Sequence, residues 1–152
     1  MVSFSLGSKE ERCQNSLECA LKISEILNKI LNPYYLKRNY YEMNIRIGID
    51  FGPIKTEKIG KKAKSQLIIT GSPANTAKIL EEKGKDLNNF YQNSKICFGY
   101  DILYNLSEND IRNSEGSYLY RNIGSLSNTT SYMDKSKPYK IYEYTGRFYV
   151  RE

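Results

Sequence analysis

The chain has 152 residues, a length that fits one domain with a real hydrophobic core. It has no histidine, so His-based hydrolytic triads and His-bound zinc are excluded. No run approaches about 18 consecutive apolar residues, and the N-terminus lacks the features of a signal peptide. Cys13, Cys19 and Cys97 show no metal-binding spacing and are expected to be reduced, buried thiols. The sequence therefore predicts a cytoplasmic protein without a membrane span.

The net charge is +6, from 23 Lys and Arg against 17 Asp and Glu. The lysines are scattered in short groups at residues 58–64, 83–85 and 135–140, as on a solvated surface. No motif with interleaved basic and aromatic residues is present. Nucleic-acid binding is supported only by the charge and is not expected.

The first elements are predicted to be a strand over residues 2–6 and a helix from about residue 8 to 31. Ser8 and Glu11 form a capping box at the start of this helix. Its apolar residues recur at spacings of three and four and form one stripe: Cys13, Leu17, Ala20, Ile23, Leu27 and Ile30. Asn32-Pro33 is predicted to end the helix.

The clearest strand is expected over residues 44–50, after a tyrosine-rich connection. Its isoleucines alternate with Arg46, Gly48 and Asp50, so one side is apolar. Gly48 leaves room for a close backbone approach. A weaker strand is expected over residues 54–59, and a turn follows it.

A strand–turn–helix unit follows. Residues 66–70 are predicted to be a buried strand, and residues 72–84 a short amphipathic helix. Ser72 is expected at the N-cap, Pro73 at the first helical position and Gly84 at the C-cap. The N-terminus of such a helix can hold a phosphate or a sugar because it presents unpaired N–H donors.

The remaining elements are expected to be a strand over residues 95–99, a helix over 101–106, and strands over 117–123 and 138–144. Residues 124–137 are rich in Ser, Asn, Thr and Lys and are predicted to be a loop. The order of elements predicts a single α+β domain over residues 1–152, with a mixed or antiparallel sheet flanked by helices.

Four segments together resemble the catalytic domain of class III nucleotidyl cyclases, the adenylate and guanylate cyclases. They are RIGIDFGP, GSPANTAKILEE, SKICFGYDILYNL and PYKIYEY, and the match runs from residue 1 to about 145. The resemblance implies a ferredoxin-like core and a homodimer with active sites at the subunit interface. GSPANTA looks closest to the small Pycsar-type bacterial cyclases, which make cyclic UMP or cyclic CMP.

The implied reaction converts a nucleoside triphosphate, UTP or CTP, to a 3′,5′-cyclic nucleotide and pyrophosphate. The resemblance also implies Mg²⁺ or Mn²⁺ as cofactor, and a signalling role in bacterial anti-phage defence. The family's metal-binding aspartates fall upstream of the first strand, so the domain is expected to be N-terminally truncated and no metal ligand is assigned. Asp50 is interpreted as a turn-capping or surface residue.

The resemblance implies catalytic residues at the positions of this chain that match the family's motifs. Asn75 matches the asparagine that orients the ribose in the family. The family's transition-state arginine falls on Ile79, a departure, and Lys78 beside it carries the right charge. Asn75 and Lys78 are therefore the predicted catalytic residues.

The base-reading position falls on Ile68, which cannot hydrogen bond to a purine, so a pyrimidine fits better. The other predicted substrate-binding residues are Thr70, Gly71, Ser72 and Lys137. The absence of the metal ligands and of the arginine leaves an alternative open. In that alternative the chain is a catalytically incomplete cyclase-homology module that binds a nucleotide or a partner subunit.

Overall fold

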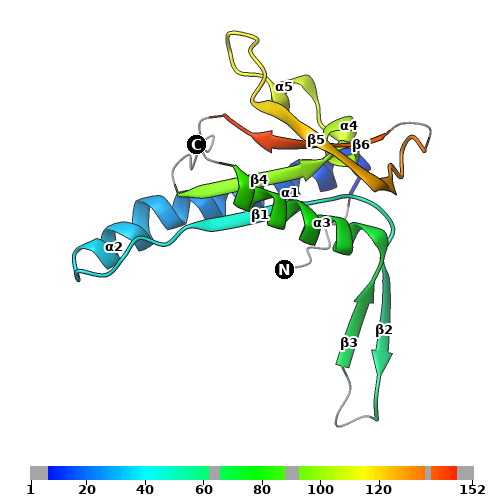
Figure 1. Cartoon of the computed structure of the whole chain (residues 1–152), viewed down its shortest axis with the longest axis horizontal. Helices are drawn as coiled ribbons and strands as arrows, with labels where there is room; N and C mark the ends of the chain where they lie inside the picture. The colour runs from blue at the N-terminus through cyan, green and yellow to red at the C-terminus, as the bar shows by residue number, and fades with distance from the viewer. Residues whose placement is uncertain (1–6, 62–65, 88–92, 136–137, 147–152) are drawn as a thin grey trace.

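The computed structural model describes residues 7–61, 66–87, 93–135 and 138–146 (Figure 1). The strand predicted over residues 2–6 lies outside the described residues. The first described helix is α1, Lys9–Ile26. Its capping box is confirmed, because the Glu11 N–H donates to Ser8 Oγ at 3.1 Å and the Ser8 N–H donates to Glu11 Oε2 at 2.6 Å.

The helix does not end at Asn32-Pro33, so that prediction is wrong. It continues through a π-helical turn, η1 (Leu27–Leu31), into α2 (Asn32–Leu36). The π-turn places Pro33 in the first turn of a new α segment, where the missing N–H is tolerated. The buried Asn32 side chain also exchanges two hydrogen bonds with the Met43 backbone, at 2.8 and 3.0 Å.

A four-stranded mixed sheet forms the centre, as predicted. Its strands are β1 (Ile45–Ile49), β4 (Ser94–Gly99), β6 (Pro138–Tyr144) and β5 (Tyr120–Thr130), in that order. β1 and β4 are parallel, and the other two pairs are antiparallel. Alternate residues of the strands pack against α1 on one face and α3 (Ser72–Lys83) on the other, which Figure 1 shows.

β5 is longer than the predicted strand, so the loop expected over residues 124–137 is wrong in its first half. The strand continues to Thr130 by pairing with β6, with register shifts between Asn122 and Gly124 and between Leu126 and Thr130. Most of its residues are exposed, which explains their polar composition. Polarity here marks a solvated strand and not a loop.

Gln66, Ile68 and Thr70 of the strand expected over residues 66–70 are exposed and Ile69 is half-buried, so the predicted burial is wrong for these residues. β3 (Gln66–Thr70) pairs only with β2 (Lys55–Ile59), in an antiparallel hairpin that projects from the body of the protein (Figure 1). The remaining elements are η2 (Gly84–Asp86), α4 (Tyr100–Asn105) and α5 (Glu108–Ile111). The last of these was not predicted.

Candidate functional site

The candidate site is at the junction of the hairpin and α3, and glycines determine its position. A Cβ added at Gly48 would lie 1.9 Å from the Ala77 carbonyl oxygen, so the helix backbone rests directly on β1, as predicted. Gly71 has φ +153°, and a Cβ there would lie 2.9 Å from the Pro53 carbonyl oxygen. Gly71 occupies the N-cap that the sequence predicted for Ser72, and Ser72 is the first helical residue.

The predicted residues of this unit lie on consecutive elements. Ile68 and Thr70 are exposed on β3, and Gly71 follows at the turn. Ser72, Asn75 and Lys78 are exposed on α3 at intervals of three residues, so they share one side of the helix.

Lys78 is surrounded by acidic side chains. Its Nζ lies 2.6 Å from Glu81 Oε2 and 3.7 Å from Glu82 Oε1, and Arg46 also binds Glu81, at 2.8 Å. The hydrogen bond with Glu81 raises the pKa of Lys78, so the side chain is a cation at neutral pH. Its charge is matched by carboxylates on the next turn of its own helix.

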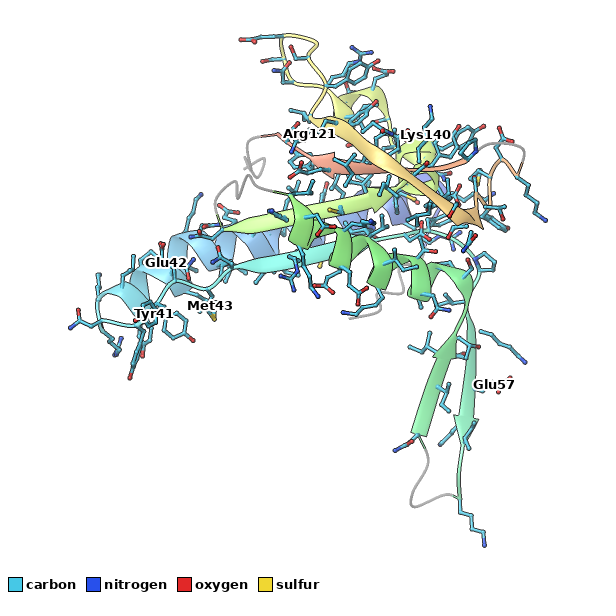
Figure 2. All side chains as sticks on the ribbon, in the orientation of Figure 1. Tyr41, Glu42, Met43, Glu57, Arg121 and Lys140 are labelled. Carbon is cyan, nitrogen blue, oxygen red and sulfur yellow. The ribbon has the colours of Figure 1, made fainter. Side chains whose placement is uncertain are left out.

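Lys137 lies outside the described residues. Lys140, the nearby lysine of β6, is exposed. Figure 2 shows Lys140 and Arg121 on the sheet, well away from Glu57 on the projecting hairpin. The described part of the chain therefore places the base and ribose candidates on the consecutive elements β3 and α3, and the lysine predicted for the triphosphate is outside it.

Asp50 is not a surface residue, so that interpretation is wrong. It is half-buried and accepts a hydrogen bond from the Tyr139 hydroxyl. Burial raises the pKa of Asp50 to about 7. Its partner Tyr139 is 1% exposed, and burial followed by the nearby Asp50 charge raises the pKa of that hydroxyl.

Asp101 is a second buried acid, which sequence reasoning missed. It is 2% exposed, and it accepts the N–H of Tyr132 at 2.6 Å, the N–H of Met133 at 3.2 Å and the Ser131 hydroxyl. Its sequence signal is weak, because an acid in the first turn of a helix is common and is usually solvated.

These carboxylates do not fit a divalent metal ion. Both oxygens of Asp101 already accept donors from the chain, and a carboxyl with the raised pKa of Asp50 is a poor ligand. Within the described ranges, no three His, Cys, Asp or Glu side chains are grouped as a metal site. No chemistry is assigned here to the Mg²⁺ or Mn²⁺ that the resemblance implies.

The cysteines are free thiols, as predicted. Cys13 and Cys97 are buried, as predicted, and Cys19 is partly exposed, so its predicted burial is wrong. No helix in the described part of the chain has the length and apolar character needed to cross a membrane.

Comparison with known proteins identifies the fold. No protein-family model matches the chain, and no curated protein sequence is significantly similar. The solved structures that resemble it include the adenylyl cyclase CyaB from P. aeruginosa, with a TM-score of 0.63 and 16% identity over 92% of this chain. The guanylyl cyclase Cya2 has a TM-score of 0.60 and 14% identity over 94% of this chain.

The chain spans 62% of the length of each of these two structures. The mixed sheet with helices on its faces is the common architecture. The chain therefore has a class III cyclase-like α+β fold, as the resemblance implied.

Proposed function

We propose that this chain is a nucleotidyl cyclase domain that acts on a nucleoside triphosphate, with UTP or CTP as the substrate. The ribose 3′-oxygen attacks the α-phosphorus, the bond to the β-phosphate oxygen breaks, and the 3′ proton leaves to solvent. The products are a 3′,5′-cyclic nucleotide and pyrophosphate. The observation that carries the proposal is the exposed Asn75, on the first turns of α3 beside the hairpin, in a cyclase-like fold.

Asn75 is well suited to contact a ribose, because its amide both donates and accepts and its side chain faces solvent. The N-terminus of α3 beside it presents unpaired N–H groups that favour an anion. Lys78, one turn further along, adds a cation on the same side of the helix. Together these groups support binding of a phosphorylated sugar.

The pyrimidine preference depends on Ile68. Its side chain is 38% exposed on β3 and offers an apolar surface without a hydrogen-bonding group. A purine-reading site needs a polar group at this position, because a site selects a base by hydrogen bonds to its edge. We therefore expect UTP or CTP to be preferred over ATP and GTP.

The projecting hairpin supports a homodimer. Every residue of β2 is exposed, and Ile59 at its end is 54% exposed. An isolated two-stranded hairpin is only marginally stable in water, so a second copy of the chain packed against it would stabilise it. A dimer through this hairpin would place a second subunit beside Asn75.

A second candidate function is a catalytically incomplete cyclase module that binds a nucleotide or a partner subunit. Two observations favour it: Ile79 stands at the arginine position, and the described residues hold no fitting metal site. Such a module would bind a nucleotide through Asn75 without turning it over.

One experiment distinguishes the two functions. The chain is incubated with each of the four NTPs and MnCl₂, cyclic nucleotides are measured by mass spectrometry, and binding is measured by calorimetry. Formation of cyclic UMP or cyclic CMP, reduced about 100-fold in Asn75→Ala, supports the enzyme. Binding that is lost in Asn75→Ala without any product supports the module. Asn128→Ala on β5 is the matched control, since Asn128 is also exposed. If the chain neither binds a nucleotide nor forms a product, the enzyme and the nucleotide-binding form of the module are both rejected.

We also propose that the cyclic nucleotide is a signal in bacterial anti-phage defence, which rests on the resemblance of GSPANTA to Pycsar-type cyclases. Bacteria that express the chain with its neighbouring genes should form fewer phage plaques than bacteria that express Asn75→Ala. Equal plaque numbers would reject this role while leaving the chemistry open.

A further inference from the structure

A buried polar cluster lies beneath the first turns of α3. Its centre is the hydrogen bond from the Tyr139 hydroxyl on β6 to Asp50 Oδ1 at the end of β1. Gly99 makes this contact possible, because a Cβ there would lie 1.9 Å from the Tyr139 hydroxyl oxygen and 2.7 Å from Asp50 Oδ1. Any larger residue at position 99 would separate the two groups.

On one side, the cluster holds the turn that follows β5. Asp101 accepts the N–H groups of Tyr132 and Met133, and the buried Ser131 hydroxyl also donates to it. The Asp101 N–H in turn donates to the Tyr139 hydroxyl and stabilises its ionised form. The turn over residues 131–134 is thereby connected to Tyr139 and Asp50.

On the other side, the cluster supports α3. A Cβ at Gly48 would meet Ala77, and a Cβ at Gly52 would meet the Pro73 ring at 2.8 Å, so this side of the chain contacts the helix. Asp50 lies between these two glycines in the chain, and the buried Thr76 of α3 lies near its carboxyl group, while the Thr76 hydroxyl donates to the Ser72 carbonyl oxygen at 3.0 Å within the first turns of the helix. Thr76 is 2% exposed and directly follows the exposed Asn75 on the helix.

The surroundings of Asp50 favour a carboxyl that changes charge near neutral pH. Burial raises the pKa of Asp50 and the Asp101 charge adds to this, while hydrogen bonds from the Tyr139 hydroxyl and the Phe51 backbone oppose it. The titratable or charged groups that face it are Tyr139 from β6, Asp101 from α4 and Cys13 from α1, and Arg12 lies over the adjacent Phe51 ring. The hydrogen-bond donors around Asp50 suit its ionised form, because a protonated carboxyl group would need a hydrogen-bond acceptor in place of one of these donors.

We propose that Asp50 is a positioning residue: its carboxylate fixes the first turns of α3 against the 131–134 turn, so that a proton taken up by Asp50 weakens nucleotide binding at Asn75. The identity of the ligand rests on the proposed function, but the positioning role does not. Asp50 acts through its hydrogen bond with Tyr139 and through the packing of its neighbour Gly52 and of Thr76 at the first turns of α3, and it does not contact the nucleotide.

The positioning role is tested by NMR of the full chain between pH 5 and pH 9. The Asp50 carboxyl carbon is expected to titrate near pH 7, and the backbone amides of residues 72, 74–76 and 131–133 should shift with the same midpoint. Tyr139→Phe should move that midpoint upward, because the lost donor no longer stabilises the carboxylate. Asp50→Asn should abolish the shared titration, and the exposed Asp86→Asn should leave it unchanged. Amides that do not follow the Asp50 midpoint would overturn the proposal.

The coupling is tested by calorimetry with UTP over the same pH range. The Kd of the natural chain is expected to rise about 5- to 10-fold from pH 8 to pH 5.5, beyond any change seen in Asp50→Asn. Identical pH profiles in the two proteins would overturn the coupling while leaving the proposed function intact. No UTP binding at any pH would reject the proposed function, and the shared amide titration would still decide the positioning role. If Asp50→Asn does not fold, Tyr139→Phe is compared with the natural chain instead. The midpoint of the pH dependence of its Kd for UTP should then lie at a higher pH.

Discussion

Gly48 of β1 and Ala77 of α3 are in direct backbone contact. A Cβ on Gly48 would lie 1.9 Å from the Ala77 carbonyl oxygen and 2.6 Å from the Glu81 nitrogen. Both obstacles are backbone atoms, which cannot move aside as the end of a side chain can. The helix that bears Asn75 is therefore positioned by the absence of a side chain at residue 48.

Gly48→Ala should destabilise the fold by about 2 to 3 kcal/mol, because α3 must move away from β1. Urea unfolding followed by circular dichroism measures this loss. Gly116→Ala is the matched control: nothing lies within 4 Å of its added Cβ, and only its φ of +79° is unfavourable. We expect the control to lose about 1 kcal/mol. Equal losses in the two variants would contradict the close contact.

Asp50 should make stability depend on pH. The pKa of Asp50 is about 7 in the folded chain, against 3.8 for an ordinary aspartate, so the folded state binds more protons than the unfolded state between these two pH values. The contribution of Asp50 is thus fully present below pH 4 and is lost as the pH rises through 7. Urea unfolding at pH 5 and pH 8 should show a fall of about 1 to 3 kcal/mol that is absent from Asp50→Asn. An equal fall in both proteins would show that other groups cause it.

The hairpin should determine the association state. Ile59→Asp places a charge on an apolar position that we assign to the dimer interface, so it should shift the chain from dimer to monomer. Sedimentation velocity at several concentrations measures this shift. Ile30→Asp is the control, because Ile30 is 61% exposed on η1 and lies outside the hairpin. A dimer that survives Ile59→Asp would contradict an interface at the hairpin.

The three thiols should differ in reactivity. Burial raises the pKa of both Cys13 and Cys97 to about 12, so neither has appreciable thiolate at neutral pH. Cys19 is partly exposed. A thiol reagent such as DTNB should therefore modify Cys19 alone in the folded chain, and all three cysteines in guanidinium chloride. Rapid modification of a Cys19→Ser variant would show that a buried thiol opens to solvent.

Part of the candidate site could be predicted from sequence. The residues from Ile68 to Lys78 are close in the chain, so a motif that spans a strand, a turn and a helix preserves their arrangement. Tyr139 could not be assigned in this way. It lies 89 positions from Asp50, and only the order of the strands in the sheet brings the two side chains together.

The sequence by itself determined the local elements: the capping box of α1, the alternation in β1 and the start of α3 to within one residue. These features depend on neighbours within a few residues, so periodicity and capping chemistry reveal them. Of the predicted apolar stripe, Cys13, Leu17, Ala20 and Leu27 are buried, whereas Ile30 is exposed, so its predicted place on the buried face is wrong. Only the tertiary structure decided that β3 projects in a hairpin, that β5 extends to Thr130 and that Asp50 is enclosed with Tyr139. Strand pairing and burial depend on segments distant in sequence, because a strand satisfies its backbone hydrogen bonds with another strand and not within itself.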